Sequence, residues 1–236
     1  MTKNTYFRFK QFQLDQSLCA MKVTTDAILF GALVNVEGCE SILDIGSGTG
    51  LLSLMVAQRT SAQITAVELD PSAAQQSRLN IDNSPWASQI TQIHNSIQNF
   101  VQTNPARFDC VITNPPFFQQ ALKGPDQQRN MARHTDSLSF DDLILAITSC
   151  LSLSGTAWLL LPVESARFFL KQAKGRLYLQ QVIEVSSTRH HPPHRWVMAL
   201  RHQPEESHIT KLNIYTHPPE YTNEFKRWTQ PYYLSL

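Results

Sequence analysis

The fold of this chain is decided by the segment SILDIGSGTGLLSLMVAQ, which spans residues 41–58. Its first five residues, Ser41–Ile45, are mostly apolar, which predicts a short buried strand. Residues 46–50 then carry a glycine at every second position, and Leu51–Gln58 follows as a helix that is apolar on all sides. Missing side chains let a ligand lie against the backbone, and the N-terminus of a helix offers free N–H groups. The segment therefore predicts an α/β protein that binds a cofactor at a strand-to-helix turn.

A carboxylate stands at the end of the next predicted strand, Gln63–Glu68. Glu68 follows Gly50 by 18 residues, and a carboxylate at this place can accept hydrogen bonds from ribose hydroxyls. This much suits both NAD and S-adenosylmethionine. The spacing of the glycines, however, is GxGxG rather than GxGxxG, and Asp44 precedes the first of them by two residues. The pattern DxGxGxG resembles motif I of class I S-adenosylmethionine-dependent methyltransferases more than the turn of a dehydrogenase.

The next motif decides between the two cofactors. The predicted strand Phe108–Thr113 is the fourth of the series, and it runs into Asn114-Pro115-Pro116-Phe117. Open α/β sheets bind their ligands at the C-terminal ends of the strands. The two prolines hold the chain extended and donate no N–H, so their carbonyl groups are available as acceptors. The motif is the (Asn/Asp)-Pro-Pro-(Phe/Tyr/Trp) pattern of methyltransferases that act on amino groups.

The residue types of this motif suit an exocyclic amine such as that of adenine. Such an amine has two N–H donors and a lone pair that is delocalised into its ring. The side chain of Asn114 and the backbone carbonyl of Pro115 can accept both hydrogens and favour a tetrahedral nitrogen, whose lone pair then points at a methyl group. Phe117 would stack on the base and fix its plane. Asn114, Pro115, Pro116 and Phe117 are therefore the predicted catalytic residues.

Strand and helix signals alternate along the rest of the chain, which is typical of an α/β fold. No internal repeat or low-complexity linker marks a domain boundary, so we predict one domain over residues 1–236. Its Rossmann-like core spans residues 39–236 after an N-terminal extension at 1–38. Further strands are expected at Tyr6–Phe12, Gln89–His94, Gly155–Leu161, Leu177–Ser186, Trp196–His202 and Ile209–Tyr215. Further helices are expected to begin at Thr24-Thr25-Asp26, Asp70-Pro71, Ser139 and Val163.

Composition excludes several protein classes. Apolar residues make up 42% and charged residues 17% of the chain, which excludes wholesale disorder. No apolar run reaches about 18 residues, so no transmembrane helix is expected. The N-terminus has no apolar core typical of a secretory signal. Four scattered cysteines, without a CxxC pair, predict free buried thiols in a reducing cytoplasm rather than a zinc site.

Several segments resemble a narrower family, bacterial enzymes that methylate an adenosine next to the anticodon of a valine tRNA. The resemblance covers essentially the whole chain. It implies a Rossmann-like class I methyltransferase fold with a mostly parallel seven-stranded sheet and helices on both faces. It also implies a cytoplasmic enzyme that makes N6-methyladenosine at position 37 of the tRNA. The segments that carry it are residues 19–29, Ala66-Val67-Glu68-Leu69, residues 83–87, residues 114–120, Ala132-Arg133 and Pro193-His194-Arg195.

The resemblance also implies the residues that would hold S-adenosylmethionine. At the end of the third strand such enzymes commonly place an acidic residue against the adenine amino group, whereas this chain has Ser96. A hydroxyl accepts that hydrogen bond more weakly than a carboxylate, and Asn95 could share the task. The predicted cofactor-binding residues are Lys22, Thr25, Asp44, Gly46, Gly48, Gly50, Glu68, Ser96 and Asn114. Lys22 and Thr25 are included because a helix start before the first strand could face the methionine end of the cofactor, but a helix N-cap explains Thr25 equally well.

Cations in two places are candidates for contact with RNA. The loop after the catalytic motif carries Lys123, Arg129 and Arg133. These side chains could contact phosphates of an RNA, or the loop could simply be exposed to solvent. From Glu164 onward the chain has 10 Lys and Arg against 6 Asp and Glu, and this part contains the further candidates Arg189, His194 and Arg195. The neighbouring histidines suggest a metal site, but the reaction needs none and adjacent residues of a strand point to opposite faces, so no metal is expected.

The residues alone do not exclude two other substrates. The same motif could serve the amide of a protein glutamine, or the exocyclic amine of guanine in ribosomal RNA. The chain lacks the helical N-terminal domain of release-factor methylases and the duplicated methyltransferase domain of some ribosomal enzymes. A scaffold that binds cofactor without activity is disfavoured because all four residues of the catalytic motif are intact.

Overall fold

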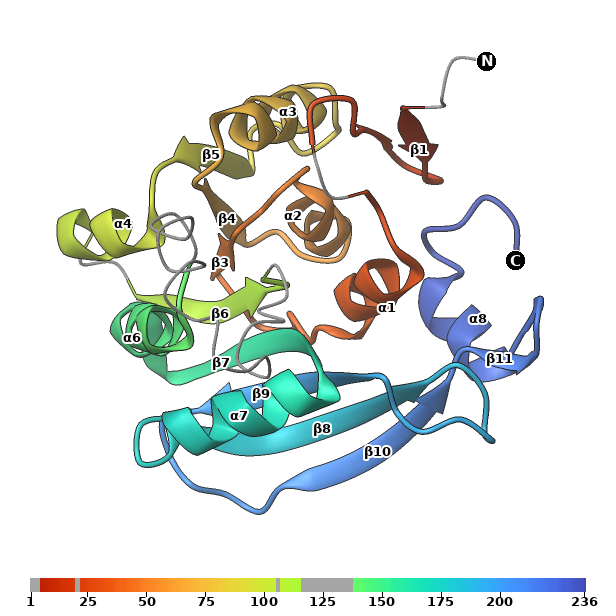
Figure 1. Cartoon of the computed structure of the whole chain (residues 1–236). Coiled ribbons are helices and arrows are strands. Elements are labelled where there is room, and N and C mark those ends of the chain that lie inside the picture. The colour runs from red at the N-terminus through yellow and green to blue at the C-terminus, as the bar shows by residue number, and fades with distance from the viewer. Residues whose placement is uncertain (1–4, 20–21, 105–106, 116–137) are drawn as a thin grey trace, which may run out of the picture.

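A mixed, mainly parallel sheet of eight strands organises the chain (Figure 1). The structure, a computed structural model, describes residues 5–19, 22–104, 107–115 and 138–236. Across the sheet the strand order is β10-β8-β9-β7-β6-β3-β4-β5. The strands are β3 Ser41–Ile45, β4 Gln63–Glu68, β5 Ile90–His94, β6 Phe108–Thr113, β7 Leu151–Pro162, β8 Tyr178–Ser186, β9 Arg195–Arg201 and β10 His208–Asn213.

Seven of these strands form the expected core, and the eighth is an addition. Strands β5, β4, β3, β6 and β7 pair in parallel, and β9 pairs antiparallel between β7 and β8. Strand β10 then lies parallel to β8 at the edge of the sheet. The sequence predicts a strand at Ile209–Tyr215, but not that it extends the sheet beyond seven strands.

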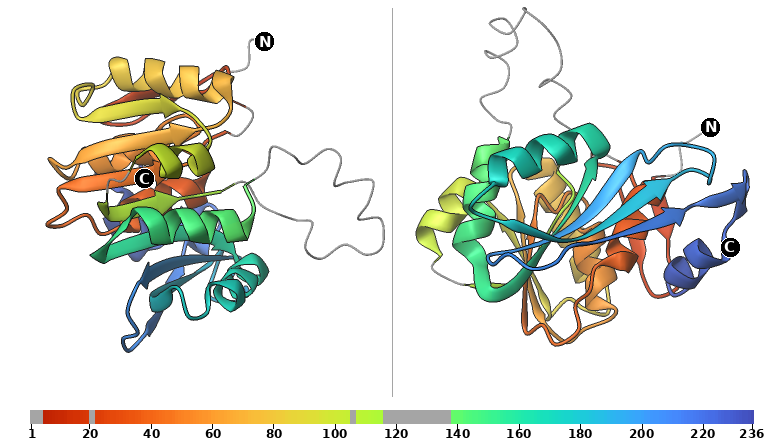
Figure 2. Two further views of the ribbon diagram at one scale, coloured as in Figure 1. Left: turned by 90° about the vertical axis from the view of Figure 1, so that its left-hand side faces the viewer. Right: turned by 90° about the horizontal axis from the view of Figure 1, so that it is seen from below.

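Helices cover both faces of the sheet, as Figure 2 shows with α6 and α7 on one side and α1 and α8 on the other. Side chains of each strand alternate between the two faces, so Ile42 packs with the α1 and α2 side whereas Leu43 packs with the α6 and α7 side. The helices are α1 Thr25–Leu33, α2 Leu51–Ala57, α3 Pro71–Asp82, α4 Ile97–Thr103, α6 Phe140–Cys150, α7 Val163–Ala173 and α8 Asn223–Thr229. None of the described helices is long and apolar enough to cross a membrane.

Three expected helix starts are confirmed with their capping residues. The side chains of Thr24, Asp70 and Ser139 each accept a hydrogen bond from a backbone N–H of the first turn. The Ser139 hydroxyl also donates to the Asp142 carboxylate at 2.7 Å, so the two side chains of the first turn are in direct contact.

The N-terminal strand prediction is wrong in its extent. Instead of one strand over Tyr6–Phe12, the chain forms an antiparallel hairpin of β1 (Tyr6–Arg8) and β2 (Gln13–Asp15). The rings of Phe9 and Phe12 are buried in the turn and stack with their centroids 4.4 Å apart. Burial of these rings, rather than strand pairing, sets the path of the chain between the two short strands.

The cysteines are free, as expected. Cys19, Cys110 and Cys150 are buried, but Cys39 is only half-buried. Residues 105–106 and 116–137 lie outside the described part of the chain, and so does most of the predicted loop that follows the catalytic motif.

Candidate active site

The C-terminal ends of β3, β4 and β6 meet at one edge of the sheet, here called the site edge. Strand β3 lies between the other two, with Ile45 opposite Val67 on β4 and opposite Thr113 on β6. The Thr113 hydroxyl donates to the Ile45 carbonyl at 2.9 Å, which ties the two strand ends together. The site edge therefore brings the glycine turn, Glu68 and Asn114 together from three separate parts of the sequence.

The three glycines of the turn are required for two different reasons. Gly46, Gly48 and Gly50 have φ values of 71°, 56° and 80°, a left-handed conformation that other residues rarely adopt. A Cβ atom on Gly46 or Gly48 would meet no described atom within 4 Å, so the backbone faces open space there. A Cβ on Gly50 would lie 2.8 Å from Ser77 Oγ. Gly50 thus allows α3 to pack closely, whereas Gly46 and Gly48 leave room for a ligand.

Glu68 holds the glycine turn in place. Its carboxylate accepts a hydrogen bond from the Gly48 backbone N–H at 2.8 Å and another from the Asp70 N–H at 2.9 Å. Because each carboxylate oxygen has two lone pairs, both oxygens keep the capacity to accept a further hydrogen bond. Gly48 and Glu68, two of the predicted cofactor-binding residues, are thereby in direct contact.

Asp44 lies beneath the turn and is fully buried. The Ser53 hydroxyl donates to its Oδ2 at 2.7 Å, while Oδ1 has no hydrogen-bond partner in the part of the chain that is described. Burial raises the pKa of this carboxyl to about 7, against the lowering effect of the bonds from Ser53. An unpaired buried oxygen of this kind is costly, so Asp44 is expected to serve a partner that the folded chain does not supply.

A pH experiment tests the burial of Asp44. Since the pKa is about 7 in the folded state and 3.8 ordinarily, the folded state holds a proton in this interval that the unfolded state has lost. The free energy of unfolding therefore falls as the pH rises from 4 to 7, by up to about 1.4 kcal/mol per pH unit. Asp44→Asn is expected to remove this component of the slope. Denaturant unfolding at pH 5, 6 and 7 measures it, and parallel profiles for the two proteins would contradict the assignment.

Asn114 and Pro115 continue directly from β6. Asn114 is half-buried, Pro115 is buried, and the amide oxygen Oδ1 of Asn114 is itself buried without a hydrogen-bond partner among the described residues. This acceptor is one strand away from the glycine turn, since β3 and β6 are neighbours. Pro116 and Phe117, the other two residues of the motif, lie outside the described residues.

The beginning of α1 approaches the same edge, but its residues are held by the protein itself. Thr24 rather than Thr25 caps the helix, and the side chain of Thr25 lies near that of Tyr233, whose pKa is raised by burial and lowered in part by Thr25. The Lys22 ammonium is exposed and donates to the backbone carbonyls of Gln16 and Cys19. The structure thus gives Lys22 and Thr25 structural contacts, and their cofactor role stays a prediction.

Asp26 joins α1 to the first residues of β9. Its carboxylate lies 3.1 Å from His194 Nε2 and 3.4 Å from Arg195 Nε. The sequence places His194 and Arg195 among possible RNA contacts, and it offers no signal for this pairing across 168 residues. Arg189 is exposed, and its Nε donates to His190 at 3.0 Å. Among the described residues, no three His, Cys, Asp or Glu side chains are grouped as a metal site.

Relatives of this chain are named for one and the same activity. A tRNA1(Val) (adenine(37)-N6)-methyltransferase from Shewanella baltica is 44% identical over 213 residues, which cover 89% of this chain and 90% of the relative. Another with this name, from Bacteroides fragilis, is 37% identical over 98% of both chains. The chain belongs to the tRNA1(Val) (adenine(37)-N6)-methyltransferase family. Residues 23–138 also match the family model of the methyltransferase small domain.

Solved structures support the fold of this tRNA1(Val) methyltransferase family member. The crystal structure of a predicted O-methyltransferase from Agrobacterium tumefaciens superposes with a TM-score of 0.69, over 87% of this chain and 96% of that one. The two sequences are only 18% identical, so the likeness concerns the fold alone. It agrees with the class I methyltransferase fold expected from the DxGxGxG pattern.

In this member of the tRNA1(Val) methyltransferase family, Ser96 has a structural task. Its hydroxyl accepts a hydrogen bond from the Asn99 N–H at 3.1 Å and so caps α4. One lone pair is therefore in use, and contact with the adenine of a cofactor stays a prediction. The loop cations Lys123, Arg129 and Arg133 lie outside the described residues.

Proposed function

We propose that this protein transfers a methyl group from S-adenosylmethionine to N6 of adenosine 37 in tRNA1(Val). The observation that carries the proposal is Asn114-Pro115 at the end of β6, beside the glycine turn at the end of β3. The names of the relatives supply the substrate, because their sequences align with nearly the whole chain. We further propose that the protein acts in the cytoplasm.

The residues at the site edge fit S-adenosylmethionine. The unpaired buried Oδ1 of Asp44 suits an amino group, either directly or through a water molecule. The open space over Gly46 and Gly48 accommodates a ligand against the backbone, and Glu68 keeps acceptor capacity for ribose hydroxyls. When bound, the cofactor supplies a methyl group that is already activated by a positively charged sulfur.

The task of the protein is to orient the target amine. The buried Oδ1 of Asn114 accepts one N–H of the adenine amino group, and the carbonyl of Pro115 accepts the other. Both acceptors are held at the end of a central strand, so they need little reorganisation as positive charge develops on the nitrogen. A strong base is not required, because the amine loses its proton only after it has become cationic. Phe117 is proposed to stack on the base.

The target adenosine must leave its stack to reach these acceptors. Unstacking costs less in a loop than in a duplex, which agrees with a nucleotide next to an anticodon. The half of the sheet that follows β6 is available for the RNA, since the cofactor residues Asp44, Gly48 and Glu68 belong to β3, β4 and the turns after them.

Mass spectrometry of nucleosides tests this function. Unmodified tRNA1(Val) is incubated with the purified protein and S-adenosylmethionine, and N6-methyladenosine is expected in the digest. A transcript with adenosine 37 replaced by guanosine is the matched control and should stay unmethylated. Labelled methyl groups that enter release-factor protein or ribosomal RNA instead of tRNA would overturn the proposal and favour glutamine or guanine as the target.

A further inference from the structure

The site edge continues past Asn114 into a part of the surface that the cofactor residues do not occupy. Strand β7 neighbours β6, and its last residue, Pro162, lies opposite Arg195 at the start of β9. Helix α7 begins at the next residue, Val163. The first turns of α7 are therefore close to the site edge on the substrate side.

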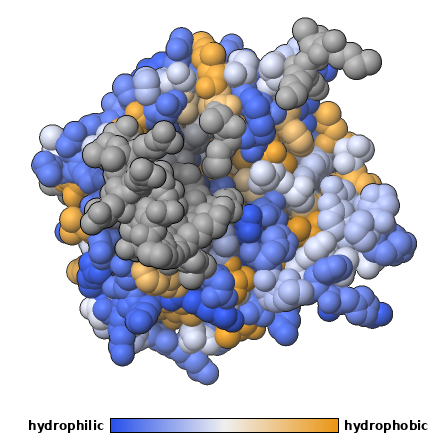
Figure 3. Space-filling model, in the orientation of Figure 1, coloured by the Kyte–Doolittle hydropathy of each residue, from blue (hydrophilic) through white to orange (hydrophobic). Residues whose placement is uncertain are grey.

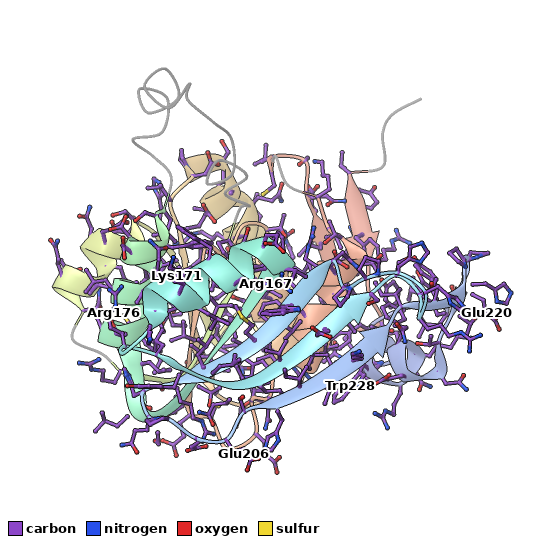
Figure 4. The ribbon with its side chains drawn as sticks, turned by 60° about the horizontal axis from the view of Figure 1, so that its bottom comes forward. Arg167, Lys171, Arg176, Glu206, Glu220 and Trp228 are labelled. Carbon is purple, nitrogen blue, oxygen red and sulfur yellow. The ribbon has the colours of Figure 1, made fainter. Side chains whose placement is uncertain are left out.

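The exposed face of α7 carries cations. Glu164, Arg167, Phe168 and Lys171 are spaced i, i+3, i+4 and i+7, so they share one side of the helix. Arg167 and Lys171 are exposed, and Phe168 is 42% exposed. These four residues are here called the outer face of α7. Figure 4 labels Arg167, Lys171 and Arg176 in this order along the helix and the turn after it.

Arg167 is held in position by an aromatic ring and by one exposed carboxylate. Its guanidinium lies over the Trp196 ring at 5.6 Å from the centroid and bonds Glu164 at 2.9 Å. An ion pair with both side chains more than 60% exposed contributes little and exchanges readily for another anion. The stacked ring restricts the side chain and leaves guanidinium N–H groups for a further acceptor. Among the described residues, Lys171 has no ion-pair partner.

We propose that Arg167 and Lys171 on the outer face of α7 bind backbone phosphates of the substrate tRNA next to its anticodon loop. This inference rests on the proposed function and adds the surface on which the RNA lies. A planar guanidinium and a flexible ammonium on neighbouring helical turns suit successive phosphates. In Figure 3 hydrophilic residues and smaller apolar patches share the described surface of this view. The outer face of α7 itself is mainly charged, which fits a polyanion better than an apolar protein partner.

Arg176 is a matched control for these two cations, because it lies beyond the end of α7. Arg176 follows the end of the helix at Ala173, which itself lies about 9 Å further along the axis than Arg167 at 1.5 Å per residue. It is also exposed, and it lies 3.3 Å from Asp141. Arg176 thus shares the exposure and the ion pairing of Arg167, but it lies beyond the C-terminal end of α7, beside Asp141 in the first turn of α6.

The test compares charge removal with charge conservation in the full-length protein. We expect R167Q/K171Q to weaken binding of unmodified tRNA1(Val) and to lower the slope of log K against log salt by about 2, or roughly 1 per lost phosphate contact. The KM for tRNA should rise while kcat at saturating tRNA stays near the parental value. R167K/K171R should retain most of the binding, and R176Q should bind like the parent.

The outcomes separate this inference from the proposed function. If the parent methylates tRNA and R167Q/K171Q has the same salt slope and KM, the outer face of α7 is not an RNA contact. Equal weakening by R176Q would also overturn the inference, because the effect would then reflect overall charge. If the parent itself does not methylate tRNA, it is the proposed function that fails.

Discussion

Asn114→Ala is expected to slow methyl transfer about a hundredfold in single-turnover experiments with saturating tRNA and cofactor. The variant loses the buried amide oxygen that has no partner within the described residues and that we assign to the adenine amine. Removing one pre-organised acceptor at a developing charge costs about 3 kcal/mol in activation free energy, which corresponds to this factor. Binding of S-adenosylhomocysteine, measured by calorimetry, should change little, because most of the predicted cofactor-binding residues belong to other strands.

A second variant separates lost chemistry from lost structure. Asn114→Asp keeps an acceptor oxygen at the same place and should retain more activity than Asn114→Ala. Thermal unfolding of both variants should resemble that of the parent, since the side chain of Asn114 is only half-buried. Near-parental rates for Asn114→Ala would show that another group orients the amine.

Gly48→Val is expected to abolish cofactor binding in a folded protein. The side chain would enter the open space over the turn, where a Cβ atom meets no described atom within 4 Å. It would also strain a residue with φ of 56°, at roughly 1–2 kcal/mol. Strain in the turn would further disturb the hydrogen bond from Gly48 N–H to Glu68. Calorimetric titration with S-adenosylhomocysteine should give no heat of binding.

Gly175→Val controls for the backbone strain. Gly175 has φ of 81°, and a Cβ there also meets nothing within 4 Å, but it follows α7 and is remote in sequence from every predicted cofactor residue. This variant should lose a similar amount of stability and bind S-adenosylhomocysteine normally. Normal affinity in Gly48→Val would instead move the cofactor away from the glycine turn.

Local sequence signals were sufficient for most of the sheet. Strands β3, β4 and β6 have the residues predicted for them, and helix α7 begins at the predicted Val163, because apolar runs with clear boundaries leave few alternatives. Strand β7 is longer than predicted and begins at Leu151, since pairing with β6 extends it past Gly155. Helices α4 and α8 were missed. Each has only seven residues, too few for an apolar period to show, whereas the equally short α2 was predicted because it is apolar on all sides and follows the glycine turn.

The candidate site likewise has features that the sequence predicts and features that depend on the folded structure. DxGxGxG, Glu68 and NPPF are local motifs, and the rule that ligands bind at the C-terminal ends of parallel strands is enough to predict that they meet. That Glu68 accepts the Gly48 N–H, or that one oxygen of Asp44 is left unpaired, depends on how side chains pack. Neither of these two features can be predicted from the spacing of residues in the sequence.

Contacts between distant parts of the chain were decided by the tertiary structure alone. The link from Asp26 to His194 and Arg195, and the stacking of Arg167 on Trp196, join residues of α1 and α7 to β9. They exist because β9 inserts antiparallel between β7 and β8 and starts at the site edge. The reaction class, in contrast, follows from two short motifs, since their backbone conformation and acceptor groups suffice for it. Which cations face the substrate depended on the order of the strands, because pairing between strands is a long-range interaction that neighbouring residues do not specify.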